Sequence, residues 1–197
     1  MIPALKIGFL ASGTGSSARA IVGAIRAGDL SAEARLLVSN NRSAPALAFA
    51  AQAGFPALCI ATQADPQAAD AELADAMAAH GVELIVLSGY LRRLGPRTLA
   101  RYAGRILTIH PGPLPAFGGH GMYGRRVHEA VIAAGAVQSG ICIHLVDEEY
   151  DRGPALARRS VAVRPGETAE SLEARVTALE AAPQGTTEYD LFCPKSG

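Results

Sequence analysis

The chain has 197 residues, 49% of them apolar and 18% charged, and its formal net charge is zero. This length suits one domain with a sizeable core, and the balanced charge argues against nucleic acid or an anionic membrane as the main partner. The three cysteines, Cys59, Cys142 and Cys193, are far apart and form no CxxC pair. They argue against a disulfide framework or a zinc site and indicate a reducing, cytoplasmic compartment. We expect neither a signal peptide nor a membrane span, because no suitable apolar run is present.

Apolar runs and helical patterns alternate along the first half of the chain. Runs typical of strands occupy residues 6–11, 34–39, 55–60, 82–87 and 105–109. Helices are predicted over residues 18–27, 44–53, 66–80 and 96–102, and Gly28, Gly54 and Gly81 are typical of helix ends. Regular alternation of this kind predicts an α/β fold with a mostly parallel, doubly wound sheet and helices on both faces.

The second half continues with fewer elements. Helical patterns at 125–134 and 168–181 flank two strand-like runs at 140–146 and 155–163. Pro183 and Gly185 then interrupt the periodicity, and none returns before the chain ends. We therefore predict a single domain over residues 1–182 and an atypical, disordered C-terminal tail over 183–197.

A glycine-rich turn, Gly13-Thr14-Gly15-Ser16-Ser17-Ala18, lies between the first predicted strand and helix. In this position a G-x-G-x-x-A pattern is typical of a phosphate cradle, although a tight turn with a hydroxyl helix cap explains it equally well. A dinucleotide-binding fold also needs an acid at the end of the second strand, where this chain has Asn40. The pattern therefore favours a phosphate monoester as the ligand. Binding of NAD is indicated by the glycine-rich turn alone.

A stiff loop follows the strand-like run at 105–109. The sequence reads Ile106-Leu107-Thr108-Ile109-His110 and then Pro111-Gly112-Pro113-Leu114-Pro115. Proline ends regular structure and restricts the backbone, so His110 is presented at the carboxyl end of a strand by a rigid loop. Ligands bind at that edge of open α/β sheets, which makes His110 a candidate functional residue.

Four carboxylates, Asp147, Glu148, Glu149 and Asp151, follow the predicted strand at 140–146. One of them facing His110 would orient the imidazole and favour its charged form, but spacing alone does not choose among them. His144 lies within that strand on the same face as Cys142, where a hydrogen-bonded structural role is expected. The remaining histidines have no metal-ligand spacing; His120 and His128 are expected at the surface or behind the site, and His80 at a helix end.

Four segments together resemble the phosphoribosylglycinamide formyltransferases, which belong to the folate-dependent formyltransferases. They are the glycine-rich turn, Ser88-Gly89-Tyr90-Leu91-Arg92-Arg93-Leu94, the run from Ile106 to Pro115, and the loop from Asp147 to Pro154. The resemblance covers residues 6–180, and the order of the motifs makes it specific. It implies a Rossmann-like sheet and the metal-free transfer of a formyl group from 10-formyltetrahydrofolate to the amine of 5′-phosphoribosylglycinamide in purine synthesis.

The resemblance also implies roles for single residues. His110 matches the catalytic histidine and Asp151 the catalytic aspartate, so that a histidinium held by Asp151 would stabilise the oxyanion and help to move the proton. Gly15, Ser16 and Ser17 match the substrate phosphate site, and Glu180 matches the acid that binds the ribose. The expected walls of the folate pocket are Leu91, Arg92, Arg93 and Leu94 on one side and Val146, Asp147, Glu148, Glu149 and Tyr150 on the other.

Three positions depart from the family pattern. Thr108 stands where the family has an asparagine that donates to the oxyanion, and a hydroxyl is shorter than an amide. Asp151-Arg152-Gly153 replaces Asp-Gly-Gly, and the sequence after Glu180 lacks the helix and further structure expected there. Loss of one oxyanion donor typically costs about 10²–10³ in rate, so Thr108 bears directly on activity.

The leading hypothesis is therefore a phosphoribosylglycinamide formyltransferase that acts on small molecules in the cytoplasm, as a monomer or homodimer. One alternative is a formyltransferase acting on another amine, such as an amino-sugar nucleotide. Another is a folate- or nucleotide-binding homologue with impaired catalysis, for which Thr108 is the main support. A methionyl-tRNA formyltransferase is disfavoured, because the chain lacks a basic face and room for a tRNA-binding domain.

Overall fold

A computed structural model describes residues 3–146 and 151–181, with the backbone alone at 180 and 181. The chain divides into two compact units, with the boundary between Leu107 and Thr108. The hydrogen-bonded strand order is β3-β2-β1-β4-β5-β6-β7, and the boundary falls within β5 (Ile106–His110). The bounds of the helices and strands agree within two residues with those predicted from the sequence.

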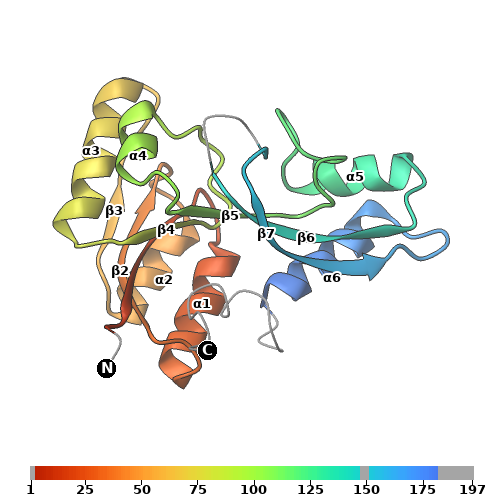
Figure 1. Cartoon of the computed structure of the whole chain (residues 1–197), viewed down its shortest axis with the longest axis horizontal. Helices are drawn as coiled ribbons and strands as arrows, with labels where there is room; N and C mark the ends of the chain where they lie inside the picture. Colours follow the sequence, from red (N-terminus) through yellow and green to blue (C-terminus); the bar gives the residue numbers. More distant parts are fainter. Residues whose placement is uncertain (1–2, 147–150, 182–197) are drawn as a thin grey trace. The chain divides into compact units, whose positions relative to one another are not determined.

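The first unit alternates strand and helix. Its elements are β1 (Leu5–Leu10), α1 (Ser16–Ala27), β2 (Ala32–Ser39), α2 (Pro45–Ala53), β3 (Ala57–Cys59), α3 (Pro66–Ala79), β4 (Leu84–Leu87) and α4 (Pro96–Arg101). Strand β1 pairs in parallel with β2 and β4, and β2 pairs in parallel with β3. Because such crossovers are right-handed, α1 and α2 cover one face of the sheet and α3 covers the other (Figure 1). The predicted doubly wound sheet is confirmed.

Strand β1 lies between helices on both faces of the sheet, which explains why its buried part, residues 7–10, contains no polar side chain. Phe9 and Leu10 are fully buried, as are Leu36 and Leu37 of the neighbouring β2. Gly8 allows α3 to pack closely, because a Cβ at this position would lie 2.6 Å from the sulfur of Met77. The strand order reverses beside β1, so the loops after β1 and β4 begin at the carboxyl ends of adjacent strands.

Helix α4 is held by a buried carboxylate from α3. Asp70 accepts hydrogen bonds from the backbone N–H groups of Arg97 (2.8 Å) and Thr98 (3.1 Å) and from the Thr98 hydroxyl (2.6 Å). A Cβ at Gly95 would lie 2.3 Å from Cγ of Asp70, so only glycine lets the chain pass this close. The carboxylate thus satisfies the orphan donors at the start of α4 and fixes the end of segment 88–94.

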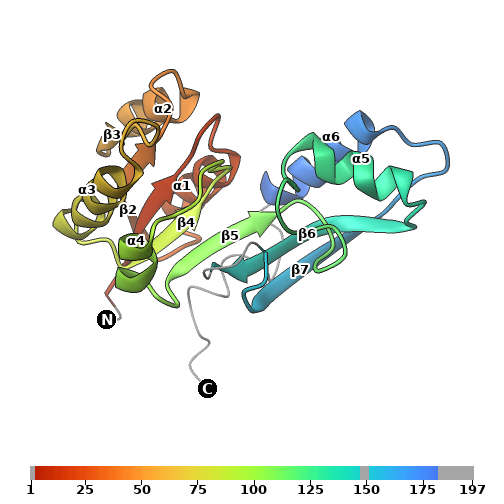
Figure 2. The same cartoon turned by 90° about the horizontal axis from the view of Figure 1, so that it is seen from above.

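The second unit contains α5 (Arg125–Ala133), β6 (Gln138–Leu145), β7 (Ala155–Ala162) and α6 (Ala169–Ala181). Strands β6 and β7 are antiparallel, and α5 and α6 lie on the same side of them (Figure 2). The core of this unit consists of the buried side chains of Val131, Ile141, Leu172 and Val176, with Ile109 and Phe117 packed against them. This core therefore contacts β5 through Ile109 and the loop after β5 through Phe117.

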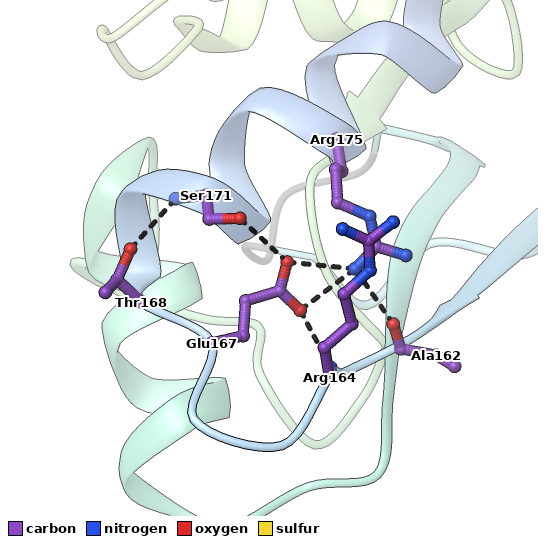
Figure 3. A network of polar contacts seen from close by, with 6 residues as sticks. All are labelled: Ala162, Arg164, Glu167, Thr168, Ser171 and Arg175. Carbon is purple, nitrogen blue, oxygen red and sulfur yellow. Dashed lines mark hydrogen bonds and ion pairs between the residues drawn. The ribbon is translucent and has the colours of Figure 1, made fainter.

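A carboxylate organises the turn between β7 and α6. Glu167 accepts hydrogen bonds from the backbone N–H of Arg164 (2.9 Å), the hydroxyl of Ser171 (3.0 Å) and Nη1 of Arg175 (2.9 Å), as Figure 3 shows. The same Arg175 nitrogen also donates to the carbonyl of Ala162 (3.1 Å). The Arg164 backbone donor and the Arg175 guanidinium lower the pKa of Glu167 to about 2.

We expect Glu167→Gln to lower the melting temperature at neutral pH, because an amide cannot accept all of these hydrogen bonds. A carboxylate with a lowered pKa in the folded state stabilises fully above its ordinary pKa of 4.5, and this contribution is lost as pH falls toward 2. The difference in melting temperature between wild type and variant should therefore be constant from pH 7 to about 4.5 and shrink below it. Calorimetry with Glu129→Gln, an exposed control on α5, checks this; a difference independent of pH would contradict it.

Candidate active site

His110 is the last residue of β5, and its imidazole is held between two oxygens. Its side chain is only 5% exposed. Nε2 lies 2.7 Å from the carbonyl oxygen of Phe117, and Nδ1 lies 3.5 Å from Oδ2 of Asp151. Both ring nitrogens thus face acceptors, and a neutral imidazole has only one N–H to donate. Uptake of a proton would complete both contacts.

Asp151 is the carboxylate that the structure brings to His110. Its Oδ2 also accepts a hydrogen bond from the backbone N–H of Gly119 (2.9 Å), and its Oδ1 lies 3.4 Å from Nε2 of His144. Asp151 has a φ of 54°, in the left-handed region that few residues other than glycine adopt. Backbone strain of this kind is typical of functional sites, where the surrounding contacts impose it.

Two glycines allow the loops around Asp151 to approach each other. A Cβ at Gly118 would lie 2.3 Å from Cδ2 of Leu114 and 3.0 Å from Cβ of Asp151. A Cβ at Gly153 would lie 1.8 Å from the carbonyl oxygen of Leu145. The Asp151-Arg152-Gly153 sequence therefore keeps glycine where the backbone requires it, and the exposed Arg152 occupies the position between.

The electrostatics of the site act in opposite directions on its two main groups. Burial lowers the pKa of His110 below its ordinary value of 6.5, although Asp151 and the Phe117 carbonyl act to raise it. Burial acts to raise the pKa of Asp151, but the contacts with His144, the Gly119 amide and His110 together hold it below its ordinary value. The resting site at neutral pH is therefore a carboxylate beside a neutral imidazole that is well placed to accept a proton.

His144 is the group that sequence reasoning missed at this site. It is 1% exposed, and its Nδ1 lies 2.9 Å from the carbonyl oxygen of Leu145. Its neighbours Cys142 and Ile143 are buried as well. Its proximity to Asp151 depends on a loop that returns seven residues later, so no local pattern could show it.

The three remaining histidines differ in their surroundings. His120 is exposed, and His80 ends α3 with its Nδ1 2.8 Å from the Ala76 carbonyl, as predicted. His128 on α5 is buried, which excludes the surface position and agrees with the alternative that it lies behind the site, where its charge interacts with that of His110. Burial lowers its pKa, and its Nδ1 has no hydrogen-bond partner among the described residues. Thr108 is half-buried on β5, two residues before His110 and hence on the same face of the strand.

The glycine-rich turn of the first unit leads directly into α1. Gly15 precedes the helix with a φ of 67°, and as a glycine it supplies no side-chain cap. A hydroxyl does contact the first turn of the helix, but it comes from Ser88, whose Oγ accepts a hydrogen bond from the backbone N–H of Ala18 (2.9 Å). Ser16 and Ser17 are the first residues of α1, which starts two residues earlier than predicted because they continue the helical turn. Arg19 stabilises the loop, because its Nε donates a hydrogen bond to the Thr14 carbonyl (2.9 Å).

The segment after β4 combines buried and exposed groups. Ser88 and Leu94 are buried, whereas Leu91 is 59% exposed and Arg92 and Arg93 are also exposed. Burial raises the pKa of Tyr90 to about 12, so this phenol stays protonated at neutral pH.

Several predicted site residues cannot be placed in this geometry. Val146 is half-buried at the end of β6, and Asp147, Glu148, Glu149 and Tyr150 lie outside the described residues. Glu180 is in α6, but its side chain also lies outside the described part of the chain.

Within residues 3–146 and 151–181, no group of three or more His, Cys, Asp or Glu side chains could hold a metal ion. No helix in that part of the chain is both long and apolar enough to span a bilayer.

Solved structures with similar folds include a transformylase and a deformylase. Glycinamide ribonucleotide transformylase 1 from Geobacillus kaustophilus is 35% identical, with a TM-score of 0.83 over 90% of this chain and 93% of that one. A formyltetrahydrofolate deformylase from Burkholderia mallei is 26% identical, with a TM-score of 0.78 over 90% of this chain and 61% of that one.

Sequence relatives agree with this similarity. A phosphoribosylglycinamide formyltransferase from Bacillus subtilis is 34% identical over 177 residues, which is 89% of this chain and 88% of that protein. A chloroplastic one from Arabidopsis thaliana is 38% identical over 87% of this chain, but this chain spans only 60% of that relative's length. The formyl transferase family model matches residues 5–185. The chain therefore belongs to the formyl transferase family.

Proposed function

We propose that the chain transfers the formyl group of 10-formyltetrahydrofolate to the primary amine of 5′-phosphoribosylglycinamide, a reaction of purine biosynthesis. The observation that carries this proposal is the His110–Asp151 contact, found at the end of a central strand in a member of this family. The Bacillus subtilis relative, whose name states this activity, is covered over 88% of its length.

Formyl transfer needs a group that accepts the proton of the attacking amine and a nearby charge that stabilises that group once it is protonated. When the amine attacks the formyl carbon, a C–N bond forms and the carbonyl oxygen becomes negative. The bond from that carbon to N10 of the folate then breaks, and the proton lost by the amine ends on N10. We propose that His110 carries this proton, and that Asp151 orients the imidazole and stabilises its charged form.

The resting geometry supports this role for His110. A neutral imidazole leaves one of its two oxygen contacts without a hydrogen, whereas the protonated ring satisfies Phe117 and Asp151 together. Proton uptake from the amine is thereby favoured inside a buried site, where a charge would otherwise be costly. To contact substrate through Nε2, His110 must exchange the Phe117 carbonyl for it, while Nδ1 remains beside Asp151.

We propose that Gly15, Ser16 and Ser17 hold the substrate phosphate. The left-handed Gly15 and the positive end of the α1 dipole suit an anion at this position. Glu180 as the ribose-binding acid remains a proposal from the family resemblance.

We propose that Leu91, Arg92, Arg93 and Leu94 bind the folate substrate; the family resemblance assigns the same role to Val146, Asp147, Glu148, Glu149 and Tyr150. Leu91 supports this assignment, because a leucine that is 59% exposed offers apolar surface to a flat ring. Action on small molecules in the cytoplasm, as a monomer or homodimer, is part of the same proposal.

The direct test is a formyl-transfer assay with 10-formyltetrahydrofolate and a panel of acceptors. We expect turnover with phosphoribosylglycinamide, and a loss of kcat of about 10²–10⁴ in His110→Ala and in Asp151→Asn with substrate binding retained. Glu129→Gln, an exposed change, serves as the control.

Other outcomes of this assay identify other functions. Tight folate binding without turnover would indicate a binding protein, and transfer only to an amino-sugar nucleotide would indicate another amine substrate. Formate release without an acceptor would indicate hydrolysis, and near-normal rates in either variant would refute the role of that residue.

Thr108→Asn should raise kcat. The amide is longer than the hydroxyl and donates from a position on the same strand face as His110, where the oxyanion would form. Since removal of an oxyanion donor typically costs about 10²–10³ in rate, even partial recovery is measurable under saturating substrates. A rate equal to or below that of the wild type would show that Thr108 is not a handicap.

The pKa of His110 can be measured by NMR titration of the five histidines, assigned by comparison with His110→Ala. We expect a midpoint below 6.5, because burial lowers it. Asp151→Asn should move the midpoint further down, because the Asp151 charge raises the pKa of His110 in the wild type. A midpoint that rises or stays the same in this variant would contradict the proposed pairing.

A further inference from the structure

Hydrogen bonds within the first unit join the loop after β4 to the loop after β1 and to the start of α1. The backbone N–H of Ser12 donates to the carbonyl of Gly89 (3.1 Å), and that of Leu91 donates to the Ser12 hydroxyl (2.8 Å). The hydroxyl of the buried Ser88 accepts from the backbone N–H of Ala18 in the first turn of α1 (2.9 Å). Ser12 therefore contacts the backbone of the loop after β4, and Ser88 contacts the backbone of α1.

The Ser12 hydroxyl has its direction fixed. Because the N–H of Leu91 can only donate, the Ser12 oxygen must accept from it, and the hydroxyl hydrogen is left for Oδ1 of Asn40 at 2.5 Å. Asn41 adds a hydrogen bond from its side-chain nitrogen to the Ser12 carbonyl (3.2 Å). The end of β2 thus holds Ser12 in the orientation that Leu91 requires.

These contacts link the two segments to which the proposed function assigns two different substrates. Ser12 directly precedes the turn proposed to hold the phosphate, and Leu91 is the first residue of the segment proposed to contact folate. Movement of either loop on ligand binding changes the position of the Ser12 hydroxyl relative to the Leu91 amide. A ligand that orders one loop therefore reduces the ordering that the other ligand must impose.

We propose that Ser12, held by Asn40, is a positioning residue that couples the binding of the phosphate-bearing amine to the binding of the folate substrate. This inference rests on the proposed function. It also gives Asn40 a role: at the strand end where a dinucleotide-binding fold carries an acid for ribose, this chain carries an amide that orients Ser12. The coupling must be reciprocal, so each ligand tightens the other by the same factor.

The experiment uses tetrahydrofolate with phosphoribosylglycinamide, a pair that cannot react. Calorimetry gives the dissociation constant of tetrahydrofolate with and without saturating phosphoribosylglycinamide. In the wild type we expect tightening of about threefold to tenfold, the factor typical of one hydrogen bond and of modest coupling. Ser12→Ala should reduce this factor to near one, and Ser12→Thr, which keeps the hydroxyl, should retain most of it.

Two further readouts separate coupling from general damage. In Ser12→Ala, the KM values for both substrates should rise by about the lost coupling factor, with a much smaller change in kcat. Hydrogen exchange at the Leu91 amide should be faster in this variant, and in the wild type phosphoribosylglycinamide should slow it. Ser31→Ala, an exposed serine before β2, is the matched control, and Asn40→Ala replaces Ser12→Ala if the latter does not fold.

The outcomes distinguish this inference from the function on which it rests. A wild type that turns over both substrates without coupling overturns the inference alone, as does a Ser12→Ala variant that keeps the wild-type factor. A wild type that neither binds nor converts the two substrates overturns the proposed function and the coupling with it.

Discussion

The Asp151 carboxylate is the group on which the geometry of the candidate active site depends. It is a charge in a half-buried position, and such a charge is costly unless its oxygens are satisfied. Here the Gly119 amide, His110 and His144 surround it. Removing any one of these three groups would leave the Asp151 carboxylate with fewer partners for its negative charge. The left-handed backbone at Asp151 and the close approach of Gly118 follow from bringing this residue to the end of β5.

The candidate sites of the two units are held together by different kinds of interaction. In the second unit, burial lowers the pKa of His110 while the charge of Asp151 raises it. The imidazole is therefore neutral at rest, and protonation lets both of its nitrogens donate hydrogen bonds. In the first unit, the hydroxyl groups of Ser12 and Ser88 hydrogen-bond to the backbone of neighbouring segments, and no charged group takes part in these contacts. A neutral network of this kind leaves the positive end of α1 uncompensated by side-chain charge, which suits an anionic ligand.

Much of the fold could be predicted because its signals are local. Continuous apolar runs identify strands buried on both faces, and glycines in the left-handed conformation, such as Gly28 and Gly54, end helices wherever they occur. The position of His110 was also accessible, since a proline-rich loop after an apolar run presents it at a strand end. The resemblance to a family then supplied Asp151, which spacing among four neighbouring carboxylates could not choose.

The sequence by itself determined the order of strands and helices, the histidine at the end of β5 and the glycine-rich turn before α1. Only the tertiary structure decided that Asp151 meets both His110 and His144, that His128 is buried, and that the Ser12 hydroxyl joins Asn40 to Leu91. The reason is physical: strand and helix periodicity arises between residues a few positions apart. These contacts join residues separated by between 7 and 79 positions and depend on how the loops close in space.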